Sequence, residues 1–224
     1  MTDTRTIRIT GKGNLKVHPD MTRITITLNG LDKEYSKALQ HSAEDTKTLA
    51  KSLKTLGFQR KDLKTLKFSV DTEYEDYTEK DLYKTNYKRR LIGYSFTHKV
   101  KIEFESDNKR LGKILYTLAN MTLRPEFTLS YTVKDTEAVK NMLLGNAVKD
   151  AKTKAQVLTD AAEVKLGRMV SIDYSWQEVN FEMMPSNHSM FYSKATVSDG
   201  SFDVDIEPDD IDVSDTVTIV WEIC

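Results

Sequence analysis

Cysteine is the scarcest residue in this chain of 224 residues, with a single copy at Cys224. One thiol cannot form a disulfide within the chain, so no covalent cross-link holds the fold together. A chain of this length buries roughly 70% of its unfolded surface without such help. We therefore expect a core of packed apolar side chains and a fold that fits a reducing compartment.

An excess of charge of either sign is also missing, because 33 basic residues are balanced by 34 acidic ones and the net charge is -1. Long-range attraction to nucleic acid or to an anionic membrane needs a strong basic excess. No apolar run is long enough for a membrane span or a signal peptide. The sequence predicts a soluble protein without membrane insertion, cytoplasmic as written and periplasmic if a leader has been removed.

Recognisable catalytic and cofactor motifs are missing as well. The chain has no Gly-x-Ser-x-Gly elbow and no internal cysteine, and it lacks the Walker, dinucleotide and zinc-protease patterns. Gly11-Lys12-Gly13 is not followed by a third glycine or by a predicted helix, so we interpret it as a bend in a strand. We expect no enzyme activity, no catalytic residues and no cofactor.

Histidine occurs four times, and the spacing of the four matches no metal site. His98 lies on the apolar side of a predicted strand. We interpret it as a core or rim histidine with one hydrogen-bond partner rather than as a ligand, and we expect no bound metal.

Apolar residues at every second position predict most of the strands. The clearest example is 94–104, where Tyr94, Phe96, His98, Val100, Ile102 and Phe104 share one face. The same alternation predicts strands at about 5–17, 21–28, 66–70, 127–133, 170–176 and 217–223.

The longest helical pattern runs over about 135–166, with Asp135 as a plausible N-cap and Gly167 as a plausible terminator. Its predicted buried stripe, rich in alanine, is Leu144, Val148, Ala151, Ala155, Leu158 and Ala162. Small side chains in such a stripe allow a close approach to a sheet or to another helix.

Two shorter helices are predicted from caps and apolar spacing. One is capped by Asp32, ends at Gly57 and buries Tyr35, Ala38 or Leu39, Ser42, Leu49, Leu53 and Leu56. The other is capped by Asp107 and buries Leu111, Ile114 or Leu115, and Leu118.

A segment rich in charge and tyrosine separates two strands over 74–90. Three interpretations are open: a surface where bases stack on tyrosine, a protein contact surface, or a solvated hairpin extension. Interleaved acidic residues would repel phosphate, so we expect no nucleic-acid partner. The candidate contact residues are Tyr74, Tyr77, Tyr83 and Tyr87.

The segment 177–214 has no periodicity and combines methionine and histidine with a run of acidic residues. Methionine with histidine can bind copper and clustered carboxylates can bind calcium, but neither spacing is specific here. A long irregular segment is often used for contacts, and methionine packs adaptably against a partner chain. The methionines with this proposed role are Met183, Met184 and Met190.

Several short motifs together resemble the SIMPL-domain family over nearly the whole chain. They are Gly11-Lys12-Gly13 followed by Pro19-Asp20, the Gly93-Tyr94 strand opening, the helix from Asn146 to Ala155, Lys165-Leu166-Gly167 and the lead-in from Pro208 to Ile211. That family includes bacterial proteins described as oxidative-stress defence proteins and a periplasmic surface antigen that assembles into large rings. The resemblance implies a fold of sheet and helices, homo-oligomerisation and no catalytic residues. Many members carry an export signal, which is not seen here.

The sequence therefore predicts an α+β fold, a mostly antiparallel sheet of about seven strands packed against three helices. We expect a single domain over 1–224 with a long irregular insertion at about 177–214. The expected function is that of a non-enzymatic, self-associating protein with a role related to stress. The alternative is a module that binds a peptide or a small ligand, of unknown identity, in a groove between sheet and helices.

Overall fold

The computed structural model describes residues 5–81, 84–174, 179–184, 197–198 and 200–224, and the chain forms two compact units. Unit 1 comprises Met1–Asp20, Tyr131–Met183 and Pro208–Cys224, and unit 2 comprises Met21–Ser130 and Met184–Glu207. The α+β class and the antiparallel pairing are confirmed. The strands are divided between a three-stranded sheet, a four-stranded sheet and a short pair.

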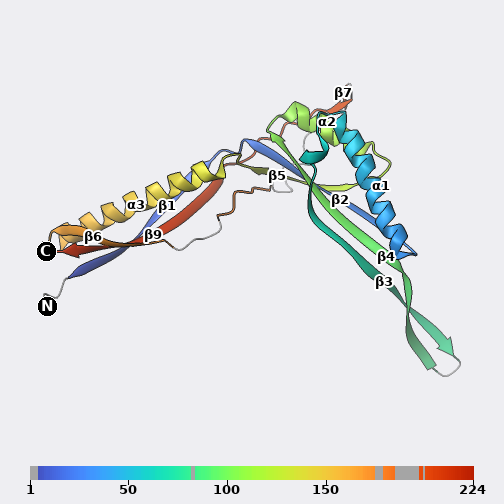
Figure 1. Cartoon of the computed structure of the whole chain (residues 1–224), viewed down its shortest axis with the longest axis horizontal. Helices are drawn as coiled ribbons and strands as arrows, with labels where there is room; N and C mark the ends of the chain where they lie inside the picture. The colour runs from blue at the N-terminus through green and yellow to red at the C-terminus, as the bar shows by residue number, and fades with distance from the viewer. Residues whose placement is uncertain (1–4, 82–83, 175–178, 185–196, 199) are drawn as a thin grey trace. The chain divides into compact units, whose positions relative to one another are not determined.

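Unit 1 is a three-stranded antiparallel sheet in the order β1-β9-β6, with one long helix lying along it (Figure 1). Alternate residues of β9 are buried on the side of the helix, from Ile211 to Trp221. The strict alternation predicted for the end of the chain is therefore confirmed. The elements are β1 (Thr6–Val17), α3 (Thr136–Ala161), β6 (Leu166–Asp173) and β9 (Ile211–Ile223).

The buried face of α3 differs from the predicted stripe. Only Ala151 and Ala155 of that stripe are buried, whereas Val148 and Leu158 are 38% and 50% exposed. The buried residues recur at a strict spacing of four, which forms one ridge along the helix. They are Val139, Leu143, Ala147, Ala151, Ala155 and Thr159.

The physical reason for this ridge lies in β1. A Cβ atom added to Gly11 would lie 2.1 Å from the carbonyl oxygen of Ala147, and one added to Gly13 would lie 2.1 Å from that of Leu143. The backbone of α3 therefore contacts these two glycines directly. This contact determines which side of α3 faces the sheet, and so which of its residues are buried. β1 pairs with β9 through both glycines without a register break, so the strand carries no bulge there; the expected bend stays a prediction.

The ends of α3 follow the sequence prediction in part. Asp135 is confirmed as the N-cap, since its Oδ1 accepts a hydrogen bond of 2.9 Å from the backbone N–H of Ala138. Gly167 is not the terminator. The helix ends at Ala161, Glu163 takes a positive φ of 55°, and Gly167 lies within β6.

Unit 2 is a four-stranded antiparallel sheet in the order β3-β4-β2-β5, with α1 packed on it and α2 packed against α1 and the short β7-β8 pair. Ile24, Ile26 and Leu28 alternate into its core, as do Phe96, Val100 and Ile102. The elements are β2 (Met21–Asp32), α1 (Tyr35–Lys54), a 3-10 turn (Arg60–Asp62), β3 (Lys64–Asp81), β4 (Lys84–Glu105), α2 (Asn108–Ala119), β5 (Glu126–Thr132), β7 (Val197–Ser198) and β8 (Ser201–Phe202).

One of the two predicted caps in unit 2 is confirmed. Asp107 accepts a hydrogen bond of 2.9 Å from the N–H of Lys109 and caps α2. Asp32 does not cap α1, whose N-cap is Glu34 without a side-chain bond. Asp32 instead binds His41, in the second turn of the helix.

Some predicted apolar faces remain uncovered within their own unit. Tyr35 and Leu39 of α1, Leu66 and Phe68 of β3, and Val170 and Ile172 of β6 are all exposed. Alternation indicates a strand, but it does not show that a helix is available to cover each apolar side. These exposed apolar residues are therefore available for contacts with a ligand or a partner.

Replacing Gly11 by alanine should destabilise unit 1, because the added methyl group would meet helix backbone that cannot move aside. We expect a loss of roughly 3 kcal/mol in the free energy of unfolding. Urea denaturation followed by Trp221 fluorescence in a Trp176→Phe background measures it, since Trp221 lies in the core of unit 1.

The matched control is Gly145→Ala on the exposed side of α3, where an added Cβ meets nothing within 4 Å. This change should raise stability by roughly 0.5–1 kcal/mol. Equal stabilities for Gly11→Ala and the parent protein would contradict the close contact between α3 and β1.

Candidate functional site

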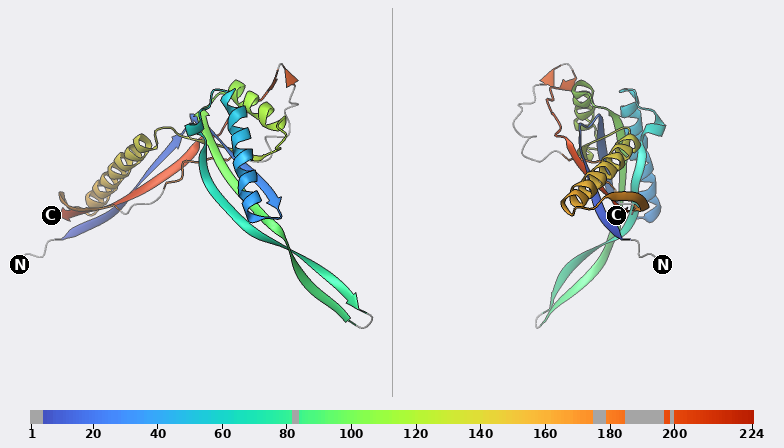
Figure 2. Two further views of the ribbon diagram at one scale, coloured as in Figure 1. Left: turned by 45° about the vertical axis from the view of Figure 1, so that its right-hand side comes forward. Right: turned by 90° about the vertical axis from the view of Figure 1, so that its left-hand side faces the viewer.

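Beyond the end of β2, strands β3 and β4 continue as a two-stranded antiparallel arm, which we define as residues 73–93. Pairing of β2 with β4 ends at Asp32↔Tyr94, whereas pairing of β3 with β4 continues to Asp81↔Lys84. Figures 1 and 2 show this ribbon running past α1 and β2, and no third strand or helix among the described residues of unit 2 lies on it. The hairpin extension considered from the sequence is therefore present.

Charged side chains of the arm lie beside one another and beside tyrosine rings. The guanidinium of Arg89 lies 4.4 Å from the ring centre of Tyr74, and that of Arg90 lies 5.5 Å from the ring centre of Tyr77. Arg90 also donates two hydrogen bonds, of 2.9 and 2.7 Å, to one carboxylate oxygen of Glu75. Lys88, Arg89 and Arg90 of β4 thus have acidic or aromatic partners on β3.

The structure brings three of the predicted contact residues together on the arm. Tyr74, Tyr77 and Tyr87 are 46%, 38% and 84% exposed. Tyr83 and Met190 lie outside the described residues. The remaining two methionines are not on the arm: Met183 is half-buried in unit 1, where its backbone pairs with Tyr131, and Met184 is 67% exposed.

A second surface runs along the free edge of β1, which is the outer strand of its sheet. A groove of about 440 Å³ lies between this edge and the exposed Val157 and Leu158 of α3. Its floor and rim are formed by Arg8, Ile9, Thr10, Thr153 and Lys154.

The backbone of β1 determines which groups face this groove. Ile223 donates its N–H to the carbonyl of Arg5, so the odd-numbered residues of the strand exchange hydrogen bonds with β9. The even-numbered residues direct their N–H and C=O groups outward, and the N–H of Lys12 is bound there by the Asp150 carboxylate at 2.7 Å. Arg8 and Thr10 therefore present backbone groups to the groove.

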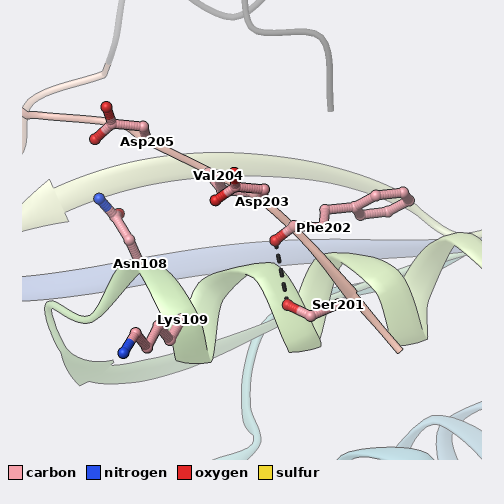
Figure 3. Close-up of a pocket in the computed structure, with 7 residues that line it drawn as sticks. All are labelled: Asn108, Lys109, Ser201, Phe202, Asp203, Val204 and Asp205. Atoms are coloured by element: carbon pink, nitrogen blue, oxygen red, sulfur yellow. Dashed lines mark hydrogen bonds between the residues drawn. The ribbon is translucent and has the colours of Figure 1, made fainter. Parts of the chain in front are cut away.

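A larger hollow of about 590 Å³ lies where the segment Ser201–Asp205 crosses α2 (Figure 3). Phe202 approaches so closely that its carbonyl oxygen would be 2.1 Å from a Cβ on Gly112. The hydrogen bond drawn there joins the Ser201 hydroxyl to the Phe202 carbonyl, within the segment itself. The hollow follows from this crossing, and its lining side chains do not converge on a shared point.

The most connected polar cluster surrounds His98, beside a pocket of about 390 Å³ between α1, β3 and β4. Its Nδ1 lies 3.0 Å from the Thr46 hydroxyl and 3.4 Å from the Ser42 hydroxyl, and its Nε2 lies 3.0 Å from the Thr65 hydroxyl. The sequence predicted a single partner for this histidine, and the structure gives it three.

Proton counting assigns the tautomer of His98. The single hydroxyl proton of Thr46 is donated to the carbonyl of Ser42 at 2.7 Å, so Thr46 must accept from Nδ1–H. Nε2 then carries the lone pair and accepts the proton of Thr65. Burial lowers the pKa of His98, and the positive charge of Arg60 lowers it further, which agrees with a neutral ring.

The pKa of His41 is shifted in the opposite direction, because this histidine lies between carboxylates. Its Nδ1 binds the Asp32 carboxylate at 2.9 Å, and its Nε2 lies 3.6 Å from the Asp45 carboxylate. The hydrogen bond to Asp32 raises the pKa of His41, whereas burial raises the pKa of Asp45. The cluster ties the first turns of α1 to the end of β2. Sequence reasoning missed this role, although the spacing of four between His41 and Asp45 indicates a contact on a helix.

Within the described ranges, no three histidine, cysteine or acidic side chains group as a metal site, and no helix is long and apolar enough to cross a membrane.

Comparison with known proteins places these features in a family context. The SIMPL family model, described as "Protein of unknown function (DUF541)", matches residues 7–221, which covers most of both units. The 26 kDa periplasmic immunogenic proteins of Brucella melitensis biotype 1 and Brucella abortus are each 26% identical to this chain over 166 residues. Each alignment covers 74% of this chain and 65% of the relative, so the chain spans less than two thirds of these relatives.

Titration of the imidazole signals by NMR should show the pKa of His98 below its ordinary value and that of His41 above it. Thr65→Val should raise the pKa of His98, because the neutral ring loses the hydrogen bond to Nε2. Thr72→Val on the same strand is the control and should leave it unchanged. If Thr65→Val left the pKa of His98 unchanged, the assigned tautomer would be contradicted.

The effect of His98 on stability follows from the same direction. Because the folded state binds this proton less tightly than the unfolded state, the unfolded state gains protons first as the pH falls below about 6.5. His98 should therefore lower the free energy of unfolding on acidification through that range. His41, with its raised pKa, should lose its stabilising contribution as the pH rises through its folded pKa.

Proposed function

Because this chain belongs to the SIMPL family, we propose that it is a non-enzymatic protein that self-associates, with the arm of residues 73–93 as the main contact. The observation that carries the proposal is a two-stranded ribbon that exposes tyrosines, on which the described part of unit 2 places no further strand or helix. Isolated two-stranded ribbons are marginally stable in water. A partner that covers the arm would supply the missing burial.

The chemistry of the arm supports a second copy of the chain as that partner. Tyrosine and arginine are enriched where protein interfaces derive most of their binding energy. The arm carries acidic residues mainly on β3 and basic residues on β4, so one arm offers both signs of charge to another. The net charge of -1 adds little long-range repulsion between copies.

The free edge of β1 supports a further contact between copies. Its outward N–H and C=O groups can pair with an added strand, and exposed edges of this kind are templates for such pairing. Val157 and Leu158 would lose water beside that strand. Asp150 limits the available edge, because it already binds the N–H of Lys12.

The arrangement at His98 supports a non-enzymatic role. The Ser42–His98 contact has the residue types of a nucleophile and its base. However, Nδ1 faces Ser42 with its proton in place, so it cannot accept the proton of that hydroxyl. The other ring nitrogen binds a threonine hydroxyl rather than an orienting carboxylate.

We place the protein in the periplasm as part of this proposal, because both relatives are named as periplasmic proteins. A role in stress defence, which the resemblance to the family implies, belongs to the proposal in the same way.

The pocket beside His98 favours a second candidate function, a module that binds a small ligand or a peptide between sheet and helix. It combines exposed apolar walls with converging hydroxyl and imidazole groups, which is the usual composition of a small-molecule site.

The arm proposal predicts a particle larger than the 25.7 kDa chain in multi-angle light scattering. The triple variant Tyr74→Ser, Tyr77→Ser, Tyr87→Ser should weaken association by about 100-fold or more, at roughly 1–2 kcal/mol per tyrosine. The mass should fall towards that of a single chain at concentrations where the parent protein remains assembled.

The control is Met142→Ser with Val148→Ser, which removes exposed apolar side chains from α3 outside the β1 groove. This variant should assemble like the parent. A parent protein that is monomeric at every concentration, or a tyrosine variant that assembles unchanged, would overturn the proposal.

A further inference from the structure

The pocket beside His98 has two kinds of lining. Side chains of α1 and β3 form apolar walls, while hydroxyl and imidazole groups form a polar side and one guanidinium belongs to a 3-10 turn. The walls are Leu39, Ala43 and Phe68, the polar side is Ser42, Thr46, Thr65 and His98, and the guanidinium is that of Arg60.

Most of the polar groups in this pocket satisfy one another. Thr46, Thr65 and the two nitrogens of His98 form a closed set of hydrogen bonds. Ser42 differs, because its oxygen can only accept from Nδ1–H, at 3.4 Å, and its own proton is donated in no hydrogen bond of the described residues. Ser42 is only 2% exposed, so this buried donor faces the pocket without an acceptor.

Arg60 is the second group whose interaction is incomplete. It forms no ion pair within the described part of the chain, although its charge acts on His98. The acidic residue on the same turn, Asp62, is already engaged, because its carboxylate accepts a hydrogen bond of 2.7 Å from the N–H of Gln59. The exposed guanidinium of Arg60 lines the pocket and is available to an anionic ligand.

We propose that this pocket binds a small amphipathic monoanion, a carboxylate carried on an aromatic or aliphatic body. Arg60 pairs with the carboxylate, the Ser42 hydroxyl donates to a ligand oxygen, and Phe68 and Leu39 cover the apolar body. A guanidinium suits a planar carboxylate because it can donate two parallel hydrogen bonds.

The lining argues against a highly charged ligand such as a phosphate ester. A single arginine supplies the positive charge, and the walls on the other side are apolar. Phosphate sites instead gather several cations or a series of backbone N–H groups at a helix N-terminus. The inference rests on the second candidate function and is independent of self-association through the arm.

The test uses the full chain with 3-phenylpropanoate as the probe and the neutral 3-phenylpropanamide as its match. Binding is followed through the imidazole signals of His98 by NMR. The carboxylate should shift these signals saturably and raise the pKa of His98, because a negative charge beside the ring favours its protonated form. The amide should bind at least about tenfold more weakly.

The variant Arg60→Gln removes the proposed partner of the carboxylate and should weaken 3-phenylpropanoate binding by about tenfold or more. Lys61→Gln is the matched control, because it removes the same charge from the neighbouring exposed residue, which does not line the pocket. Binding to this control should equal that of the parent protein.

The possible results distinguish a failure of the anion site from a failure of the ligand pocket and from a failure of self-association. Equal binding of acid and amide, or an unchanged affinity in Arg60→Gln, would overturn the anion site while leaving a pocket for neutral ligands. Binding of neither probe would overturn the pocket as a ligand site together with the inference. Light scattering of the same variants reports self-association separately, and it should be unchanged by Arg60→Gln.

Discussion

Burial of alternate strand residues beneath helices is the interaction on which both units depend. Ile219 and Ala151 in unit 1, and Ile26 and Leu49 in unit 2, are fully removed from solvent. A fully buried isoleucine or leucine side chain contributes roughly 1.5–3 kcal/mol, so these seams stabilise each unit. The arm, the β1 edge and the pocket beside His98 lack such cover. Each belongs to a sheet whose other residues are buried beneath a helix.

In unit 1 the helix and the sheet approach each other closely enough for their backbones to touch. Gly11 and Gly13 let the backbone of α3 contact that of β1, and small residues on the helix complete the fit. The contact turns Val157 and Leu158 towards the rim of the β1 edge rather than into the core. The same constraint that stabilises the unit therefore creates one of its candidate contact surfaces.

Strand alternation was predictable from the sequence because a period of two is visible without knowing the neighbouring strand. The N-caps at Asp107 and Asp135 were predictable for the same reason, since a cap is a local interaction. The buried ridge of α3 was not, because the position of Gly11 under Ala147 becomes visible only when β1 and α3 are brought together. The tyrosines of the arm were identified as candidate contacts, but the His98 cluster joins Ser42 and Thr46 to Thr65 across distant parts of the chain, and no local pattern marks it.

The arm links this architecture to the proposed function, because no third strand and no helix among the described residues of unit 2 lies on it. Hydrogen exchange at its backbone amides tests that claim directly. If copies cover one another's arms, protection of the amides from Tyr74 to Tyr77 and from Lys88 to Leu91 should rise with protein concentration, while that of buried α3 amides such as Ala151 should stay constant. Arm protection that is the same at every concentration would contradict the account.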